Sequence, residues 1–216
     1  METPDTHTLR LDTYFEYRTG QFIQVMIPND KVIRSYSLSS SPTEKGFVSI
    51  TVKAEPMGHL SNLLIKLQAG DILDVKGPFG VFSLPQPTTG PIIYLPAGSG
   101  VAPFRAMGKF LNDQNYADPQ WMFYTAKTPV DLIFHKELES WAQRPTCHYI
   151  PTVTRPFEGP WSGERGRMDE AKFRKYLPNF EGTFLLCGPD AFVKAMIDLL
   201  SGPLQVPATR IRREIW

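Results

Sequence analysis

The spacing of apolar residues divides the chain into two parts. Up to about Leu84, apolar residues come in short, often alternating runs that Gly, Pro or Asp interrupts. These runs predict strands at 20–27, around Tyr36, at 47–53 and at 71–76. One short helix is expected among them, because four leucines repeat at helical spacing: Leu60, Leu63, Leu64 and Leu67. The first part is therefore predicted to be an antiparallel β-barrel or sandwich.

The second part alternates continuous apolar runs with helical patterns. Strands are expected at 92–95, 121–124, 148–154, 183–186 and 209–216, and helices at 103–111, at 131–142 and after 186 as far as Leu200. This alternation predicts a doubly wound α/β domain with a parallel sheet. The segment 84–91 holds three prolines and is the predicted linker. We therefore expect one domain at 1–86 and another at 91–216.

Composition and charge exclude several classes of protein. The 216 residues carry 23 Lys plus Arg against 22 Asp plus Glu, so the net charge of +1 offers no field for nucleic acid or an anionic membrane. Two cysteines, Cys147 and Cys187, cannot hold a four-cysteine iron–sulfur cluster or zinc site, and no metal is expected. The acidic start and the lack of a long apolar run favour a soluble, cytoplasmic protein.

A glycine-containing loop follows the first strand of the second part. The loop is Ala97-Gly98-Ser99-Gly100-Val101-Ala102-Pro103, and it opens a helix. Gly98 and Gly100 would let the backbone approach a pyrophosphate, and the helix N-terminus would supply N–H donors. Pro103 suits a first helical turn, although it stands where the full dinucleotide fingerprint has a third glycine. Gly-x-Gly alone is also typical of a tight turn; the strand before it and the helix after it favour the nucleotide.

Basic residues follow the next two strands and predict the nucleotide preference. An NAD-preferring site usually places an acid after the second strand, but this strand ends in Thr125-Ala126-Lys127-Thr128. Arg155 follows the third strand and Arg167 lies beyond it. Three cations near one sheet edge would suit a 2′-phosphate, so NADPH is favoured over NADH. The alternative interpretation is a solvated basic face.

Two motifs in the first part suit a flavin. In Arg34-Ser35-Tyr36-Ser37, an arginine can grip a diphosphate, a tyrosine can stack on a flat ring and a serine can hydrogen-bond a ring nitrogen. Gly58-His59-Leu60-Ser61 would aim the start of the short helix at the same diphosphate. A surface arginine and a packed tyrosine would explain the first motif equally well in isolation.

Taken together, the motifs resemble the ferredoxin–NADP reductase family in order and spacing, over nearly the whole chain. They are Gly20-Gln21-Phe22, Arg34-Ser35-Tyr36-Ser37, Gly58-His59-Leu60-Ser61, Gly77-Pro78-Phe79-Gly80, the glycine loop to Pro103, Cys187-Gly188-Pro189 and Glu214-Ile215-Trp216. The resemblance implies a six-stranded antiparallel FAD barrel followed by an NADP-binding α/β domain. The family's first barrel strand normally precedes the segment that begins at Thr3, so the barrel is expected to lack that strand.

The resemblance also implies the role of each residue. Arg34 would hold the FAD pyrophosphate, Tyr36 would stack on the isoalloxazine and Ser37 would contact its N5 edge. Ser35 is also implied to bind FAD. Further FAD contacts are implied for Val52, Lys53, Gly58, His59, Leu60, Ser61 and Asn62. The NADP set comprises Gly98, Ser99, Gly100, Val101, Pro103, Lys127, Arg155, Arg167, Cys187, Gly188 and Pro189.

Four residues are implied in catalysis: Ser37, Cys187, Glu214 and Trp216. Cys187 would lie near the nicotinamide carbon from which the hydride leaves, although a buried cysteine is more often a small apolar packing residue. Glu214 and Trp216 match the Glu-x-aromatic ending of the plant-type members, in which the terminal aromatic stacks on the flavin and moves aside for nicotinamide. The alternative for Trp216 is a frayed terminus.

These expectations combine into an FAD-dependent oxidoreductase that takes a hydride from NADPH or NADH and passes electrons to a separate carrier. The carrier would be a ferredoxin, a flavodoxin or an oxygenase component, because this chain lacks cluster cysteines. One alternative is an NAD(P)H:flavin reductase that uses flavin as a substrate. Another, of a different class, is a non-catalytic FAD- or nucleotide-binding regulatory module. The oligomeric state stays open.

Overall fold

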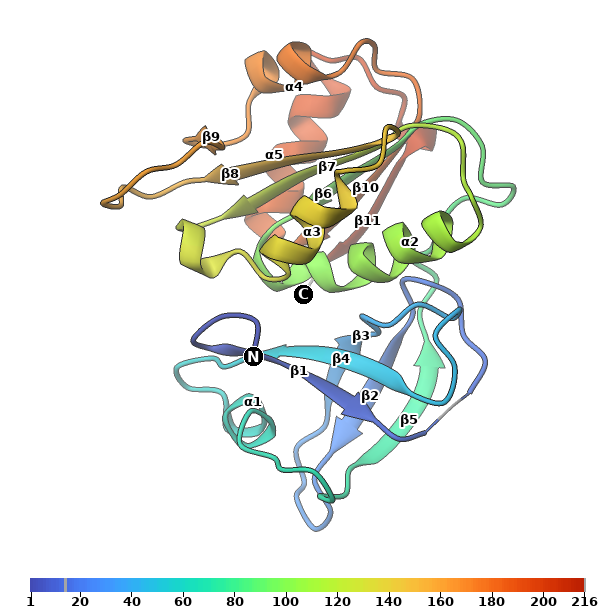
Figure 1. The fold of residues 1–216 in the computed structure, drawn as a ribbon, viewed down its shortest axis with the longest axis vertical. Coiled ribbons are helices and arrows are strands. Elements are labelled where there is room, and N and C mark those ends of the chain that lie inside the picture. The colour runs from blue at the N-terminus through green and yellow to red at the C-terminus, as the bar shows by residue number, and fades with distance from the viewer. Residues whose placement is uncertain (14, 216) are drawn as a thin grey trace. The chain divides into compact units, whose positions relative to one another are not determined.

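The computed structural model describes residues 1–216 except Tyr14 and Trp216 (Figure 1). The chain forms two compact units. The first contains Met1–Leu84 and Ala102–Tyr116, and the second contains Pro85–Val101 and Ala117–Trp216. The chain therefore passes from one unit to the other three times.

The first unit contains five antiparallel strands among its described residues. They are β1 (Thr6–Leu11), β2 (Phe22–Met26), β3 (Arg34–Ser37), β4 (Val48–Lys53) and β5 (Asp74–Phe79). β1 pairs with β4, and β3, β2 and β5 form a second sheet in that order. An antiparallel bridge between Leu38 and Ile50 connects the two sheets. The antiparallel first part that the sequence predicts is confirmed.

The core of the first unit follows the two-residue period of its strands. Ile23 and Val25 of β2 and Ile50 and Val52 of β4 are fully buried, together with leucines of the short helix α1 (His59–Leu64). The Leu60 and Leu64 side chains, four residues apart, both join this cluster. The helix that the leucine spacing predicts is therefore present and is held by its apolar face.

Helix α2 (Ala102–Asp113) belongs to the first unit, although the glycine loop before it belongs to the second. The Arg105 guanidinium donates a hydrogen bond to the Ser39 carbonyl at 2.7 Å. Its Nη1 also lies 3.9 Å from a carboxylate oxygen of Glu44. These polar contacts tie the helix to the segment that follows β3.

The second unit contains a parallel sheet of six strands in the order β11-β10-β6-β7-β8-β9. Their bounds are β6 (Ile92–Pro96), β7 (Gln120–Ala126), β8 (Cys147–Val153), β9 (Glu164–Arg165), β10 (Thr183–Gly188) and β11 (Ile211–Ile215). Every neighbouring pair is parallel, so the carboxyl ends of all the strands point toward one edge. This is the doubly wound sheet that the sequence predicts.

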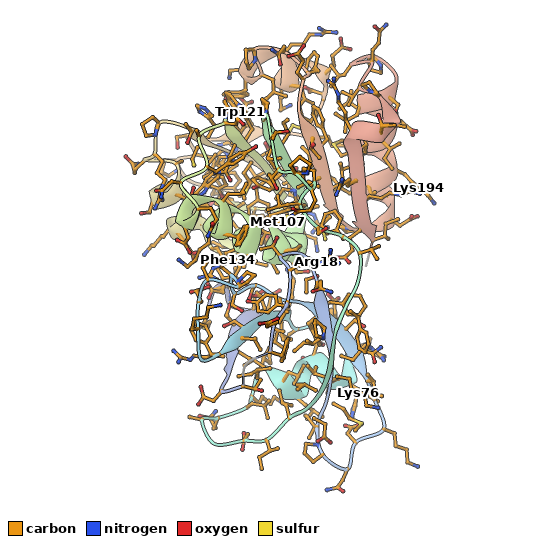
Figure 2. All side chains as sticks on the ribbon, turned by 90° about the vertical axis from the view of Figure 1, so that its right-hand side faces the viewer. Arg18, Lys76, Met107, Trp121, Phe134 and Lys194 are labelled. Atoms are coloured by element: carbon orange, nitrogen blue, oxygen red, sulfur yellow. The ribbon has the colours of Figure 1, made fainter. Side chains whose placement is uncertain are left out.

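Helices cover both faces of this sheet (Figure 1). Helix α3 (His135–Trp141) lies on one face, and α4 (Glu170–Tyr176) and α5 (Asp190–Ser201) lie on the other. The α4 and α5 face packs Phe173 and Val193 against Phe123 and Leu186. Near the start of the strands, the Trp121 ring, labelled in Figure 2, stacks on His148 with 3.7 Å between the ring centroids. Within the described residues, none of the helices has the length and hydropathy of a membrane span.

Two predicted elements begin three and four residues later than expected. The strand expected at 71–76 begins at Asp74, because the Asp71 carboxylate accepts a hydrogen bond from the Gln68 N–H at 2.7 Å and closes a turn. The helix expected at 131–142 begins only at His135. Asp131 ends a separate 3₁₀ turn, and Phe134 has a φ of 60°, which an α-helix cannot continue through.

Three elements were not expected from the sequence: β1, the two-residue strand β9 and helix α4. β1 is polar and only partly buried, and β9 is too short to show any periodicity. Helix α4 follows an Asp169 N-cap, whose carboxylate accepts from the Lys172 N–H at 2.9 Å, and buries only Phe173. A single buried aromatic leaves too weak a pattern to predict.

We predict that Glu164 stabilises the second unit in a pH-dependent manner. Its Oε1 accepts hydrogen bonds from the Lys175 ammonium and the Tyr176 hydroxyl, each at 2.6 Å, and these bonds lower the pKa of Glu164. The stabilisation is therefore present above the ordinary glutamate pKa of about 4.3 and is lost as the pH falls through the lowered native value.

Glu164→Gln should reduce the free energy of unfolding by about 1 kcal/mol at neutral pH, and the difference should shrink under acid. Chemical denaturation across a pH series measures it, with the exposed Glu158→Gln as the matched control. A Glu164 effect that did not depend on pH would contradict the assignment.

Candidate functional site

The predicted nucleotide residues of the second unit meet at the carboxyl edge of its sheet. Cys187, in β10, pairs in register with Pro96 of β6 on one side and with Glu214 of β11 on the other. Proline lacks an N–H, and the Ala97 N–H donates to the Cys187 carbonyl at 2.9 Å. The strand end that carries Cys187 is thus bonded directly to the start of the glycine loop.

The two loop glycines have different structural roles. Gly98 has a φ of 55°, and a Cβ at this position would meet nothing within 4 Å, so the backbone here is accessible to a ligand. A Cβ on Gly100 would instead lie 2.3 Å from the Cys187 carbonyl oxygen. Gly100 is therefore required for the loop to pack on β10. Ser99 and Val101 complete the 3₁₀ turn η1 (Gly98–Val101).

The Cys187 side chain is almost fully buried, with 1 % of its surface exposed. Burial raises the pKa of its thiol well above the ordinary value, and the negative charge of Glu214 raises it further. Cys187 is therefore a small neutral group at neutral pH. Gly188 and Pro189 follow it, and the Pro189 carbonyl accepts the first backbone bonds of α5, from Phe192 and Val193.

The predicted phosphate-binding cations lie along the same edge. The Arg155 N–H donates to the Lys127 carbonyl at 2.9 Å, so the residues that follow β7 and β8 are adjacent. The Gly166 N–H donates to the Val153 carbonyl at 2.8 Å and brings the segment with Arg167 beside them. Lys127, Arg155 and Arg167 are all exposed.

Arg165 is a further cation at this edge that sequence reasoning missed. It pairs in register with Val153, and its guanidinium carbon lies 4.5 Å from the centroid of the Phe157 ring. β9 has only two residues, so no strand pattern pointed to Arg165. The spacing Arg165-Gly166-Arg167 was the available clue.

In the first unit, β3 carries the four predicted flavin residues on one strand. Arg34 and Ser35 are exposed, and Tyr36 and Ser37 are partly buried. The Arg34 guanidinium donates to the Ile33 carbonyl at 2.9 Å. Tyr36 packs against the core cluster that contains Val52 and Leu60, and burial raises the pKa of its phenol. The structure thus brings Tyr36, Val52 and Leu60 together.

The side chains around α1 are engaged within their own loops. The Ser61 hydroxyl accepts from the Glu55 N–H at 3.2 Å, and the Asn62 amide donates to the Gly58 carbonyl at 2.7 Å. His59 Nε2 lies 2.7 Å from Asp30 Oδ2. Contact with a phosphate in this loop would therefore fall mainly to backbone N–H groups.

Four predicted residues remain to be described: Val52, Lys53, Pro103 and Trp216. Lys53 Nζ forms an ion pair with Asp5, 3.2 Å away, and the Val52 side chain points into the core. Pro103 is the second residue of α2 and belongs to the first unit. Trp216, the predicted aromatic gate, lies outside the described residues.

Known protein families match both units. A model described as "Oxidoreductase FAD-binding domain" matches residues 3–84, and one described as "Oxidoreductase NAD-binding domain" matches residues 95–198. The chain belongs to the oxidoreductases that combine these two domains. The resemblance seen in the sequence is confirmed at the level of the family.

Curated relatives of this oxidoreductase are longer proteins. The glycine betaine monooxygenase reductase subunit of Chromohalobacter salexigens is 35 % identical over 193 residues, which are 86 % of this chain and 52 % of that protein. A flavohemoprotein of Halalkalibacterium halodurans is 31 % identical over 216 residues, covering 93 % of this chain and 52 % of that protein. The oxidoreductase chain spans about half the length of the curated relatives it matches.

Solved structures show the same fold. A cytochrome P450 reductase from Amycolatopsis superposes with a TM-score of 0.88 at 24 % identity, covering 100 % of this chain and 66 % of that chain. A ferredoxin NADP+ reductase from Neisseria gonorrhoeae with bound FAD and NADP superposes with a TM-score of 0.79 at 21 % identity. The match covers 99 % of this chain and 94 % of that chain. The fold of the oxidoreductase is that of the ferredoxin reductases.

The residues present fit the two cofactors of the family. Gly98 leaves an open approach for a diphosphate, and the exposed cations nearby offer donors for a further phosphate. On β3, the exposed guanidinium of Arg34 suits the diphosphate of FAD, and the half-buried phenol of Tyr36 suits its flat ring. Among the described residues, no group of three or more His, Cys, Asp or Glu side chains could hold a metal ion.

We predict that Gly100→Ala weakens dinucleotide binding about tenfold or more, because the new methyl group must push the loop away from the Cys187 carbonyl. Isothermal titration with NADPH measures the change. Gly90→Ala is the control, since Gly90 has a positive φ but open space around its Cβ, and its substitution should leave affinity unchanged. Unaltered binding in Gly100→Ala would contradict the assigned packing.

Proposed function

We propose that this chain is the electron-transferring reductase part of a redox system, taking a hydride from NADPH or NADH to FAD and passing electrons to a separate acceptor. The observation that carries the proposal is the packing of the glycine loop on the Cys187 carbonyl. This packing supports the proposal because it brings the glycine loop, proposed to bind the diphosphate, next to Cys187, proposed to lie at the nicotinamide end, so that one dinucleotide could reach both.

FAD, when bound, supplies the change from two-electron to one-electron chemistry. The chain's own residues bind FAD and the dinucleotide and orient them. On β3, Arg34 is an exposed donor for a diphosphate, and Tyr36 offers a ring that its core contacts hold in place. At the sheet edge, Cys187 contributes a small, neutral, water-excluded surface, because its thiol is buried and stays protonated.

Three relatives support a partner protein as the acceptor. They are named as the reductase subunit of glycine betaine monooxygenase, the reductase component of propane 2-monooxygenase and the phenol hydroxylase P5 protein. By analogy with these proteins, we propose an oxygenase component as the acceptor. A ferredoxin or a flavodoxin is the alternative carrier.

Anaerobic stopped-flow mixing of the FAD-loaded protein with NADPH or NADH tests the proposal. We expect rapid bleaching of the flavin absorbance, followed by reoxidation when a one-electron acceptor protein is added. Protein that loses its yellow colour on desalting and reduces only added flavin would be a flavin reductase instead. Binding without any bleaching would support a regulatory module.

We also propose that the site prefers NADPH. The proposal is supported by the positions of Lys127 and Arg155, which follow the adjacent strands β7 and β8, and of Arg167, which follows the next strand, β9. An exposed guanidinium can bind a 2′-phosphate through two parallel hydrogen bonds. The 1–86 and 91–216 domain ranges stay predictions alongside it.

Arg155→Ala should raise the Kd of NADPH about tenfold and leave that of NADH nearly unchanged, because only NADPH carries the 2′-phosphate. Competitive titration of both dinucleotides measures the two constants. Arg174→Ala is the control, since the Arg174 guanidinium pairs with Glu170 on α4 at 2.7 Å. Equal losses for NADPH and NADH in Arg155→Ala would overturn the preference.

A further inference from the structure

A buried tyrosine of β7 links two loops at the carboxyl edge of the second unit. The Tyr124 hydroxyl donates a hydrogen bond to the Gly98 carbonyl at 2.9 Å. The same oxygen accepts a hydrogen bond from the Ile133 N–H at 3.1 Å. Gly98 opens the glycine loop, and Ile133 lies in the connection between β7 and α3. Tyr124 is fully buried, so neither bond competes with bulk water.

The first of these bonds sets the orientation of a peptide group. The Gly98–Ser99 peptide is trans, so the Ser99 N–H points to the side opposite the Gly98 carbonyl. Anchoring that carbonyl on Tyr124 therefore directs the Ser99 N–H away from Tyr124. Gly98, with a φ of 55° and open space in place of a Cβ, has little intrinsic restraint of its own. The phenol supplies the restraint that the glycine lacks.

The second bond holds the connection that begins with Lys127. Thr128 and Asp131 close a turn in this connection, with the Thr128 N–H donating to the Asp131 carboxylate at 3.0 Å. Phe134, labelled in Figure 2, is buried with a φ of 60°, a conformation that aromatic residues rarely adopt. The bond from Ile133 to Tyr124 lies directly before this residue and helps to hold it there.

We propose that Tyr124 is a positioning residue for dinucleotide binding, which fixes the Gly98–Ser99 peptide so that its N–H is presented to the diphosphate. The inference rests on the proposed function. The diphosphate is common to NADPH and NADH, so Tyr124 acts on both dinucleotides equally. Arg155, by contrast, acts on the 2′-phosphate alone.

Tyr124→Phe removes only the hydroxyl and leaves the ring in the core. Tyr149→Phe is a matched control, because Tyr149 is a partly buried tyrosine of the next strand whose hydroxyl lies 3.1 Å from His135 Nδ1 and has no bond to the glycine loop in the contacts described. We expect Tyr124→Phe to raise the Kd of NADPH and of NADH by about tenfold each, with their ratio, the bound FAD and the kcat at saturation unchanged. Tyr149→Phe should leave both Kd values as in the wild type.

Amide hydrogen exchange on the ligand-free protein supplies a second readout that needs no dinucleotide. Exchange at Ser99, Gly100 and Val101 should accelerate in Tyr124→Phe and not in Tyr149→Phe. Unchanged Kd values, a loss confined to NADPH, or equal effects of the two variants would each overturn the inference. If the wild type bound neither dinucleotide, the proposed function would fail, and the exchange measurement would still decide whether Tyr124 holds the loop.

Discussion

The proposed dinucleotide site of the second unit depends on one contact, the packing of the glycine loop against the carbonyl of Cys187. That oxygen accepts the Ala97 N–H at 2.9 Å and leaves no room for a side chain on Gly100. Because β10 pairs with β11 on one side and β6 on the other, its end cannot shift without moving both neighbouring strands. The glycine loop is thus packed against a rigid strand end, which holds in place the backbone that we propose binds the diphosphate.

In the first unit, apolar packing holds strand β3 in place in a similar way. β3 presents Arg34 to solvent while Tyr36, two residues later, packs on the core cluster with Val52 and Leu60. A short strand that is exposed at its beginning and anchored at its end can offer polar groups without losing its position. The polar side chains of Ser61 and Asn62 form hydrogen bonds within their own turn. Backbone N–H groups would therefore make most of the contacts with a phosphate in this loop.

The fold was predictable because its strongest patterns are long and periodic. The continuous runs that became β6, β7 and β10, and the leucines of α1, each bury residues at the spacing that the sequence shows. Two of the three elements that were not predicted, β9 and α4, bury little and depend on contacts such as that of Glu164 with Lys175. The motifs located the candidate site, but they could not distinguish an open Gly98 from a packed Gly100. No motif pointed to Tyr124, because the role that we propose for it depends on hydrogen bonds to the backbone of Gly98 and Ile133, which lie in separate loops.

The central claim is that the edge formed by the glycine loop and Cys187 receives the dinucleotide diphosphate and the nicotinamide end. Heteronuclear NMR titration of the FAD-loaded protein with NADP+ tests this most directly, by following the backbone amides residue by residue. The account predicts the largest shifts at Ser99, Gly100, Cys187 and Gly188, with smaller ones at Lys127 and Arg155. Saturable shifts confined to other parts of the chain, with these amides unmoved, would contradict it.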